Sequence, residues 1–162
     1  MKNISMIAAV GKNLELGKNN HLIWPLKEDL KFFKQQTIKK PIIMGMKTLQ
    51  SLPKLLPERK HIVLTRQNIS LPEEIILIHS KEELLKYIEN NPEEYMVIGG
   101  ASIYSQMLEY SDKLILTEID AEDKEADAYF PVFNKEEWNQ EILSSNRENN
   151  ISYKHLIYTR KK

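Results

Sequence analysis

Residues 95–108, YMVIGGASIYSQML, join a short apolar strand to a helix through two adjacent glycines. Tyr95–Ile98 consists of β-forming apolar residues, and apolar side chains recur at helical spacing from Ile103 to Leu108. Glycine at such a junction lets a ligand approach the backbone, and the free N–H groups at a helix start attract phosphate. A single pair of glycines is weak evidence for a site, so the other strand ends matter.

Similar alternation of strands and helices extends on both sides of this segment. Strands are predicted at Ile4–Val10, Pro41–Gly45, His61–Thr65, Ile75–Ile78, Lys113–Ile119, Trp138–Leu143 and Ile151–Thr159, and helices at Lys27–Thr37, Lys47–Ser51 and Lys81–Glu89. Ser80 and Glu83 have the spacing of a capping box for the last of these helices. The pattern predicts an α/β fold with a mostly parallel central sheet, flanking short helices and an antiparallel C-terminal strand.

The rest of the chain fits a single domain. We find no repeat or linker, so residues 1–162 are interpreted as one domain. Gly11–Pro25 is polar and rich in glycine and asparagine, and it predicts a loop too long for a simple connection. Loops of this length are more often functional.

The composition excludes several classes of function. Lysine plus arginine number 23 and aspartate plus glutamate number 23, so no global field attracts nucleic acid. The chain has no cysteine, which fits a reducing cytoplasm and removes thiolate chemistry. No apolar run approaches the roughly 18 residues of a membrane span. His21, His61, His79 and His155 lack metal-ligand spacing, so we predict no metal site and interpret them as structural or exposed.

Asp29 is an acid on the apolar face of the predicted helix 27–37. The core stripe of that helix is predicted to contain Leu26, Leu30, Phe33 and Thr37, and Asp29 falls within its arc. A buried carboxylate is costly unless it is hydrogen-bonded, paired or neutralised. Two interpretations stay open: Asp29 caps the first helical turn, or it faces a cleft that takes a flat, nitrogen-rich ligand with paired donors.

Three predicted strands end in turns suited to anions. These turns are Gly45–Thr48, Thr65–Gln67 and Gly99–Ser102. Ligands of open α/β sheets bind at the carboxyl ends of the strands, so three such turns are better evidence than one. The chain has neither a Gly-x-Gly-x-x-Gly fingerprint nor a Walker lysine motif, which disfavours a standard Rossmann domain or a nucleotide triphosphatase.

Short motifs appear in a specific order along nearly the whole chain. In sequence they are Ile4–Ala9, Gly17, Trp24 with Asp29–Leu30, Phe33–Lys34, Ile43–Gly45 with Lys47–Thr48, Leu56–Lys60, Val97–Gly100, Ile103–Tyr104, Leu116–Thr117, Asp127 and Phe130–Pro131. This set resembles the bacterial dihydrofolate reductase family. The resemblance implies a cytoplasmic, monomeric antifolate target of tetrahydrofolate biosynthesis. Its implied reaction is the NADPH-dependent reduction of 7,8-dihydrofolate to 5,6,7,8-tetrahydrofolate.

The resemblance also implies the site residues. Asp29 would bind the pterin's amino group and adjacent ring nitrogen together with Thr117 and assist protonation, through water gated by the loop at Leu22 and Trp24. Arg59 would bind the substrate's glutamate carboxylate. Further implied substrate contacts are Ile7, Phe33, Leu52 and Ile98. Implied cofactor contacts are Ala9, Leu16, Gly17, Gly45, Lys47, Thr48, Thr65, Arg66, Gly99, Gly100, Ala101, Ser102, Ile103 and Tyr104.

The chain departs from the family pattern near the cofactor. Met46 and Ser102 occupy positions that are often arginine, so Lys47 and Arg66 would have to hold the cofactor's phosphates. Proline follows Trp24 directly instead of preceding it, which alters the preferred conformations of this loop. Two alternatives stay open: a reductase of the same fold that acts on another pterin or pyrimidine, and a non-catalytic folate- or nucleotide-binding module.

Overall fold

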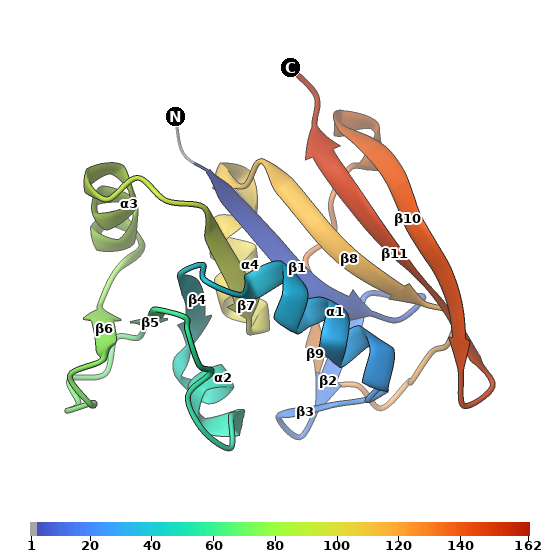
Figure 1. The fold of residues 1–162 in the computed structure, drawn as a ribbon, viewed down its shortest axis with the longest axis horizontal. Coiled ribbons are helices and arrows are strands. Elements are labelled where there is room, and N and C mark those ends of the chain that lie inside the picture. Colours follow the sequence, from blue (N-terminus) through green and yellow to red (C-terminus); the bar gives the residue numbers. More distant parts are fainter. Residues whose placement is uncertain (1–2) are drawn as a thin grey trace.

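A computed structural model describes residues 3–162 (Figure 1). The strands are β1 (Ile4–Val10), β2 (Glu15–Lys18), β3 (His21–Leu22), β4 (Ile42–Gly45), β5 (His61–Leu64), β6 (Ile75–Ile78), β7 (Tyr95–Gly99), β8 (Lys113–Ile119), β9 (Ala128–Tyr129), β10 (Trp138–Glu148) and β11 (Ile151–Arg160). The α-helices are α1 (Lys27–Thr37), α2 (Met46–Ser51), α3 (Lys81–Asn90) and α4 (Ala101–Met107). Short 3-10 turns cover Leu108–Tyr110 and Lys135–Glu137.

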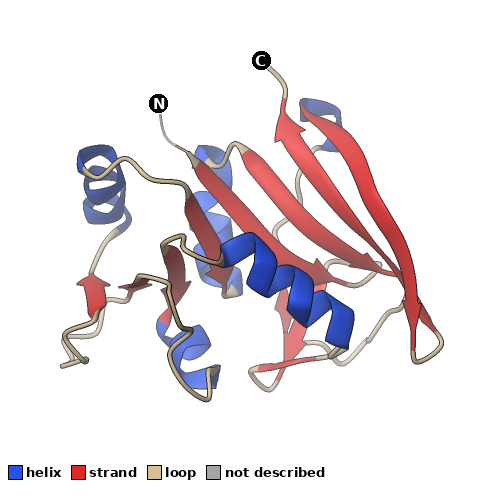
Figure 2. Ribbon diagram, in the orientation of Figure 1, coloured by secondary structure: helices blue, strands red, loops and turns tan. Residues whose placement is uncertain are grey.

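Eight strands form the central sheet, in the order β10-β11-β8-β1-β7-β4-β5-β6. The six strands from β8 to β6 in this order run parallel to one another, and β11 pairs antiparallel with both β8 and β10. In Figures 1 and 2, α1 crosses the near face of the sheet and α4 lies behind it. The predicted mostly parallel sheet with an antiparallel C-terminal strand is confirmed.

The prediction that Gly11–Pro25 is only a loop was wrong. This segment contains β2 and β3, which join β9 in a second sheet with the order β3-β2-β9. The strands are short and polar, and the partner β9 lies more than 100 residues further along the chain. Local hydrophobic periodicity therefore carries no signal for them.

The strand predicted at Trp138–Leu143 extends to Glu148 in the structure. β10 lies at the edge of the sheet, and most of its residues are exposed. Polar side chains are typical of exposed edge strands, so its second half lacks an apolar pattern. Its length comes instead from pairing with β11, which continues to Glu148 and Ile151.

Alternation along β8 separates the two faces of the sheet. Leu114 and Leu116 pack in one buried cluster, while Ile115 packs in the other, which also contains Phe32 and Phe33 of α1. Successive side chains of a strand point to opposite faces. Thr117, two residues after Ile115, therefore faces the same side of the sheet as α1.

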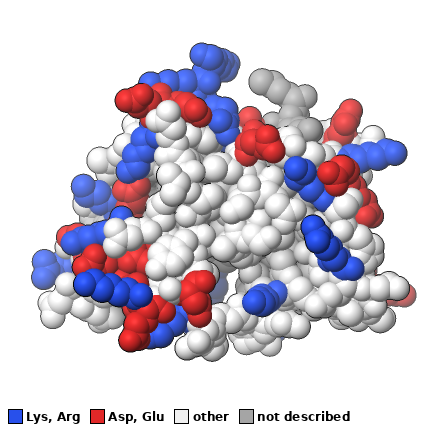
Figure 3. All heavy atoms as spheres, turned by 180° about the vertical axis from the view of Figure 1, so that it is seen from behind, with Lys and Arg blue, Asp and Glu red and all other residues white. Residues whose placement is uncertain are grey.

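Charges of both signs are distributed over the surface. Figure 3 shows lysine and arginine side chains intermixed with aspartate and glutamate around a mainly uncharged centre. Among residues 3–162, no helix has the length and apolar character needed to cross a membrane. The same residues include no group of three or more histidine and acidic side chains placed to hold a metal ion.

Candidate active site

The inward face of α1 passes through Asp29. Leu26 and Thr37 are buried, Asp29 and Phe33 are partly buried, and Leu30 is 43% exposed. The prediction that Leu30 belongs to the core stripe was therefore wrong. The positions that face the sheet follow steps of three or four residues from Leu26 through Asp29, and this stripe leaves Leu30 at its outer edge. Asp29 lies at the centre of the inward face.

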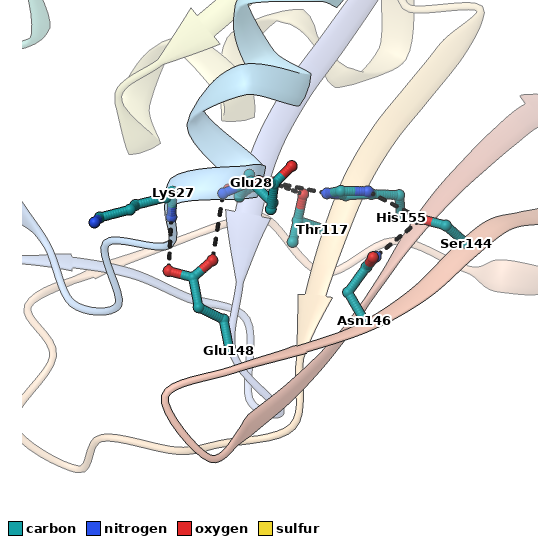
Figure 4. A network of polar contacts seen from close by, with 8 residues as sticks. Lys27, Glu28, Thr117, Ser144, Asn146, Glu148 and His155 are labelled. Atoms are coloured by element: carbon teal, nitrogen blue, oxygen red, sulfur yellow. Dashed lines mark hydrogen bonds and ion pairs between the residues drawn. The ribbon is translucent and has the colours of Figure 1, made fainter.

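A different carboxylate caps the start of α1. Glu148 of β10 accepts hydrogen bonds from the backbone N–H groups of Lys27, at 2.8 Å, and Glu28, at 3.3 Å. Figure 4 shows this carboxylate directed at the first turn of the helix. Leu26, the residue before the helix, supplies no side-chain cap. The backbone N–H groups at the start of α1 are thus capped by Glu148 and not by Asp29.

Asp29 is held by side chains from two neighbouring strands. The Thr117 hydroxyl of β8 donates a hydrogen bond to Asp29 Oδ1, and His155 Nε2 of β11 lies 3.1 Å from the same oxygen. Thr117 and His155 face each other across the β8–β11 pairing. The Asp29 side chain is only 14% exposed, so the carboxylate sits in a shielded position with fixed partners.

His155 was not predicted to be part of the site. It was interpreted as structural or exposed, yet it is buried and contacts Asp29. Its sequence offers one weak signal: on a strand it shares a face with the aromatic Tyr153. Because the β8–β11 register joins residues 38 positions apart, the sequence alone could not bring it to Asp29.

Four residues predicted to bind substrate come together in one apolar cluster. These are Ile7 of β1, Phe33 of α1, Leu52 after α2 and Ile98 of β7. Tyr104 of α4 donates a 2.6 Å hydrogen bond to the carbonyl of Ile7. Burial raises the pKa of the Tyr104 hydroxyl, so it stays a donor at neutral pH. The apolar walls and the acid therefore meet between α1 and the strand ends.

Arg59 is fixed at the far end of α1. Its guanidinium donates to the Thr37 hydroxyl at 2.9 Å, to the Pro57 carbonyl at 2.6 Å and to the Lys34 carbonyl at 3.1 Å. Burial lowers the pKa of Arg59, but an arginine keeps its charge in proteins. A cation is thus held beside the carboxyl end of the helix, where the macrodipole favours it.

His61 holds the loop that carries Arg59. Its Nε2 accepts from the Leu56 N–H, and its Nδ1 lies 3.0 Å from the carbonyl of Arg59. Because Nε2 accepts, the proton of the neutral ring is on Nδ1. Burial, with a smaller contribution from the Arg59 charge, lowers the pKa of His61 below its ordinary value of 6.5.

This environment predicts that His61 stabilises the fold only while it is neutral. Below its ordinary pKa of 6.5 the unfolded chain binds a proton more readily than the folded one, so this contribution falls as the pH drops towards the lower folded pKa. We expect the stability difference between wild type and His61→Leu to be largest at about pH 8 and smaller at about pH 5. Urea unfolding at both pH values measures it; a difference that grows on acidification would contradict the assignment.

The predicted glycine turns lie side by side. A Cβ added to Gly99 would lie 3.4 Å from Thr48 Oγ1, one added to Gly100 would lie 3.6 Å from it, and one added to Gly45 would lie 3.1 Å from Ile103. α2 begins at Met46 and α4 at Ala101, and neither helix has a side-chain cap at its start. The two turns therefore lie close together, and each leads into a helix whose first backbone N–H groups have no side-chain cap.

Several other predicted cofactor residues follow the neighbouring strand or flank the two turns in sequence. Thr65 and Arg66 follow β5, the neighbour of β4; Arg66 is exposed, and Thr65 Oγ1 accepts from the Gln67 N–H. Lys47 and Ser102 are also exposed. The Ser102 hydroxyl accepts from Gln106, and the Lys47 carbonyl accepts from the Asn20 side chain.

The segment around Trp24 is tied to the small sheet. Gly17 pairs with Leu22 and with Ala128, and Leu22 is 52% exposed. Trp24 packs with Ala9 and the buried Leu26, next to the start of α1. Leu16 packs on the main core. These residues thus connect the end of β1 to the helix that carries Asp29.

Comparison with known proteins gives a consistent result. A family model described as dihydrofolate reductase matches residues 3–160. A dihydrofolate reductase of Buchnera aphidicola from Acyrthosiphon pisum is 49% identical over 81% of this chain and 80% of that protein. One from Haemophilus influenzae is 39% identical over 97% of this chain and 98% of that protein.

Solved structures show the same similarity. The dihydrofolate reductase of Enterococcus faecalis, complexed with NADP(H) and RAB-propyl, superposes with a TM-score of 0.85. It is 29% identical, and the match covers 98% of this chain and 96% of that one.

Proposed function

The chain belongs to the dihydrofolate reductase family and reduces dihydrofolate with NADPH, and from this premise we propose which of its residues perform the reaction. Asp29 is the acid that binds the pterin and assists its protonation. The observation that carries this proposal is the position of Asp29: it is shielded on the inward face of α1 and hydrogen-bonded by Thr117, while Glu148 accepts the N–H groups at the helix start.

The proposed cofactor site lies at the two glycine turns, 45–48 and 99–102. NADPH supplies a hydride to the pterin ring when it is bound. The chain contributes the uncapped N–H groups at the starts of α2 and α4, which suit the cofactor's phosphates. Gly45, Gly99 and Gly100 leave the room that side chains would fill. Exposed Lys47 and Arg66 supply the positive charge that Met46 and Ser102 lack.

The remaining predicted residues have positioning and shielding roles in this proposal. Ile7, Phe33, Leu52 and Ile98 form the walls that place the pterin next to the nicotinamide, with Tyr104 and Ile103 behind the cofactor. Leu22 and Trp24 control the entry of the water that delivers the proton, and Ala9, Leu16, Gly17, Thr48, Thr65 and Ala101 complete the cofactor contacts. Exclusion of other water strengthens the field of Asp29 at the reacting atoms.

We propose that Arg59 binds the glutamate carboxylate of the substrate. Its guanidinium already has a fixed plane, which suits a bidentate contact with a carboxylate. Arg59→Ala is expected to raise the Michaelis constant for dihydrofolate by about 10- to 100-fold, the value of a lost charge-assisted hydrogen bond, with a much smaller change in kcat. Steady-state kinetics measure both constants.

A shortened substrate provides the control for Arg59. A dihydropterin without the glutamate tail makes no contact there, so Arg59→Ala is expected to leave its Michaelis constant unchanged. Lys54→Ala, an exposed cation in the same loop, serves as the matched variant. If the arginine substitution affected both substrates equally, Arg59 would not be the residue that binds the tail.

We also propose that the protein works as a single-domain monomer in the cytoplasm. Asp29, Thr117 and His155 contact one another within one chain, which a monomer can provide. The absence of cysteine suits a reducing compartment. Sedimentation at micromolar concentration tests the monomer, and a stable dimer would overturn it.

The activity itself is tested by mixing the purified protein with NADPH and dihydrofolate and following NADPH absorbance. We expect consumption that requires both compounds. Binding of both without consumption would instead favour a non-catalytic module.

A further inference from the structure

We propose that His155 is a positioning residue for the reaction: it fixes the orientation of the Asp29 carboxylate before the substrate binds. This inference rests on the proposed role of Asp29 as the pterin-binding acid. It concerns a residue of β11 that was not predicted to belong to the site. Two kinds of contact support it: the packing of the imidazole ring on aromatic side chains, and the polar side chains near the ring, among them Thr117, Ser144 and Asn146 in Figure 4.

Aromatic contacts hold the imidazole ring of His155 in one plane. It stacks on the ring of Phe32 with the centroids 3.9 Å apart and the planes 9° from parallel. The ring of Tyr153 contacts it edge-on at 5.6 Å. His155 is only 6% exposed, so rotation of its ring would disturb both aromatic contacts. Packing therefore fixes the plane of the ring, and the polar neighbours on its two edges place Nδ1 beside Ser144 and Nε2 beside Asp29.

A chain of hydrogen bonds selects the tautomer of His155. The Asn146 amide donates to Ser144 Oγ at 2.9 Å, and Ser144 Oγ lies 3.2 Å from His155 Nδ1. Ser144 Oγ accepts from Asn146 and can direct its own hydrogen at Nδ1, while Asp29 Oδ1 on the other edge of the ring acts as an acceptor. With Nδ1 as an acceptor, the proton of the neutral ring lies on Nε2, 3.1 Å from Asp29 Oδ1.

Asn146, the outermost member of this series of hydrogen bonds, lies where water can bind it. Asn146 also lines a cavity of about 730 Å³ together with Tyr153, Ser145 and Arg147. The remaining donor and acceptor of the Asn146 amide can be satisfied there. Every polar member between this cavity and Asp29 therefore has a partner, which is the condition under which a buried polar chain holds its groups firmly.

Two donors on one oxygen determine how Asp29 meets the pterin. Thr117 and His155 both donate to Oδ1. Together they fix the plane of the carboxylate, so Oδ2 is presented in one direction. A carboxylate that is already oriented needs no reorganisation when the substrate's paired donors arrive. His155 thus acts through Asp29 without touching substrate or cofactor.

Three substitutions separate the hydrogen bond from the packing. His155→Gln can place an N–H near the position of Nε2, His155→Asn can reach only the position of Nδ1, and His155→Phe keeps a ring on Phe32 without any N–H. We expect the Phe and Asn variants to lose about 10-fold in kcat with dihydrofolate, and the Gln variant to stay within about 3-fold of wild type. The Michaelis constant for NADPH is expected to stay unchanged in all three.

The readouts are chosen so that a merely structural role gives a different result. If His155 only fills space, the Phe variant keeps wild-type kcat and the Gln variant loses most, which would overturn the proposal. If the Phe variant does not fold, the comparison of Gln with Asn decides, since equal kcat values in these two also overturn it. Active-site titration with a tight antifolate corrects every kcat for the folded fraction.

A spectroscopic measurement tests the tautomer without using activity. In ¹⁵N-labelled wild-type protein, the imidazole signals that disappear in His155→Gln belong to His155. At a pH where the ring is neutral, we expect a protonated Nε2 and an unprotonated Nδ1, and Ser144→Ala is expected to move the ring towards a mixture. A protonated Nδ1 in wild type would overturn the proposal.

The activities of the Asp29 and His155 variants distinguish a failure of the proposed function from a failure of the His155 proposal. If Asp29→Asn retained activity, Asp29 would not be the pterin-binding acid, and the positioning role of His155 would be wrong as well. If Asp29→Asn were inactive while His155→Phe kept full kcat, only the His155 proposal would fail.

Discussion

Asp29→Asn is expected to lower kcat for dihydrofolate by at least about 100-fold at neutral pH, the contribution typical of a positioned acid or base. Asparagine keeps the shape of the side chain, and its carbonyl oxygen can still accept from Thr117 and His155 at the Oδ1 position. Its amide, however, puts a donor where the pterin also brings donors, and it carries no charge to stabilise a protonated ring. Single-turnover oxidation of NADPH isolates this step.

The fold and the cofactor site provide the controls for this substitution. We expect Asp29→Asn to bind NADPH as wild type does and to melt within a few degrees of it, because the hydrogen bonds on Oδ1 persist. Glu28→Gln is the matched variant: it removes the neighbouring acid of the same helix, whose side chain is 62% exposed, and should keep full activity. Near-wild-type turnover in Asp29→Asn would contradict the assignment of Asp29 as the acid that binds the pterin and assists its protonation.

Gly99→Ala is expected to weaken NADPH binding by at least about 10-fold and to lower the free energy of unfolding by about 1–3 kcal/mol, the cost of a strained backbone conformation. Gly99 has a φ of +129°, which L residues rarely adopt. The added Cβ would contact Thr48 and Tyr104 at ordinary distances of 3.4 and 3.5 Å, so the cost comes from the backbone. Relief of the strain would shift the turn between β7 and α4.

Gly100→Ala separates this backbone effect from a change of volume. Gly100 has a φ of −82°, and its added Cβ would lie 3.6 Å from Thr48 Oγ1. We therefore expect a smaller loss of stability than for Gly99→Ala. Calorimetric titration with NADPH and urea unfolding of both variants make the comparison. Equal destabilisation would show that the φ of Gly99 is not the cause.

The sequence predicted what depends on local pattern. Ser80 caps α3 as its spacing indicated, since its hydroxyl accepts from the Glu83 N–H. The apolar strand β1 and the helix of Asp29 follow directly from hydrophobic periodicity. The glycine junction at 99–100 also occurs where the change from strand to helix predicted it.

What the sequence could not predict depends on contacts between distant segments. β2 and β9 stabilise each other across more than 100 residues, and neither has a pattern of its own. Glu148 looks like any acid of an exposed strand until pairing with β11 brings it to the start of α1. His155 needed the same register to reach Asp29. Non-local pairing follows from the fold as a whole, which short windows of sequence do not contain.

The helix cap supplied by Glu148 has a consequence for how this enzyme is made. The acid of the site is synthesised early, at position 29, while Thr117, Glu148 and His155 follow 88 to 126 residues later. A nascent chain that ends before β10 contains the helix and Thr117 but lacks Glu148, which caps the helix, and His155, which contacts its carboxylate. The surroundings of the acid are therefore completed only when the β10–β11 pair has formed.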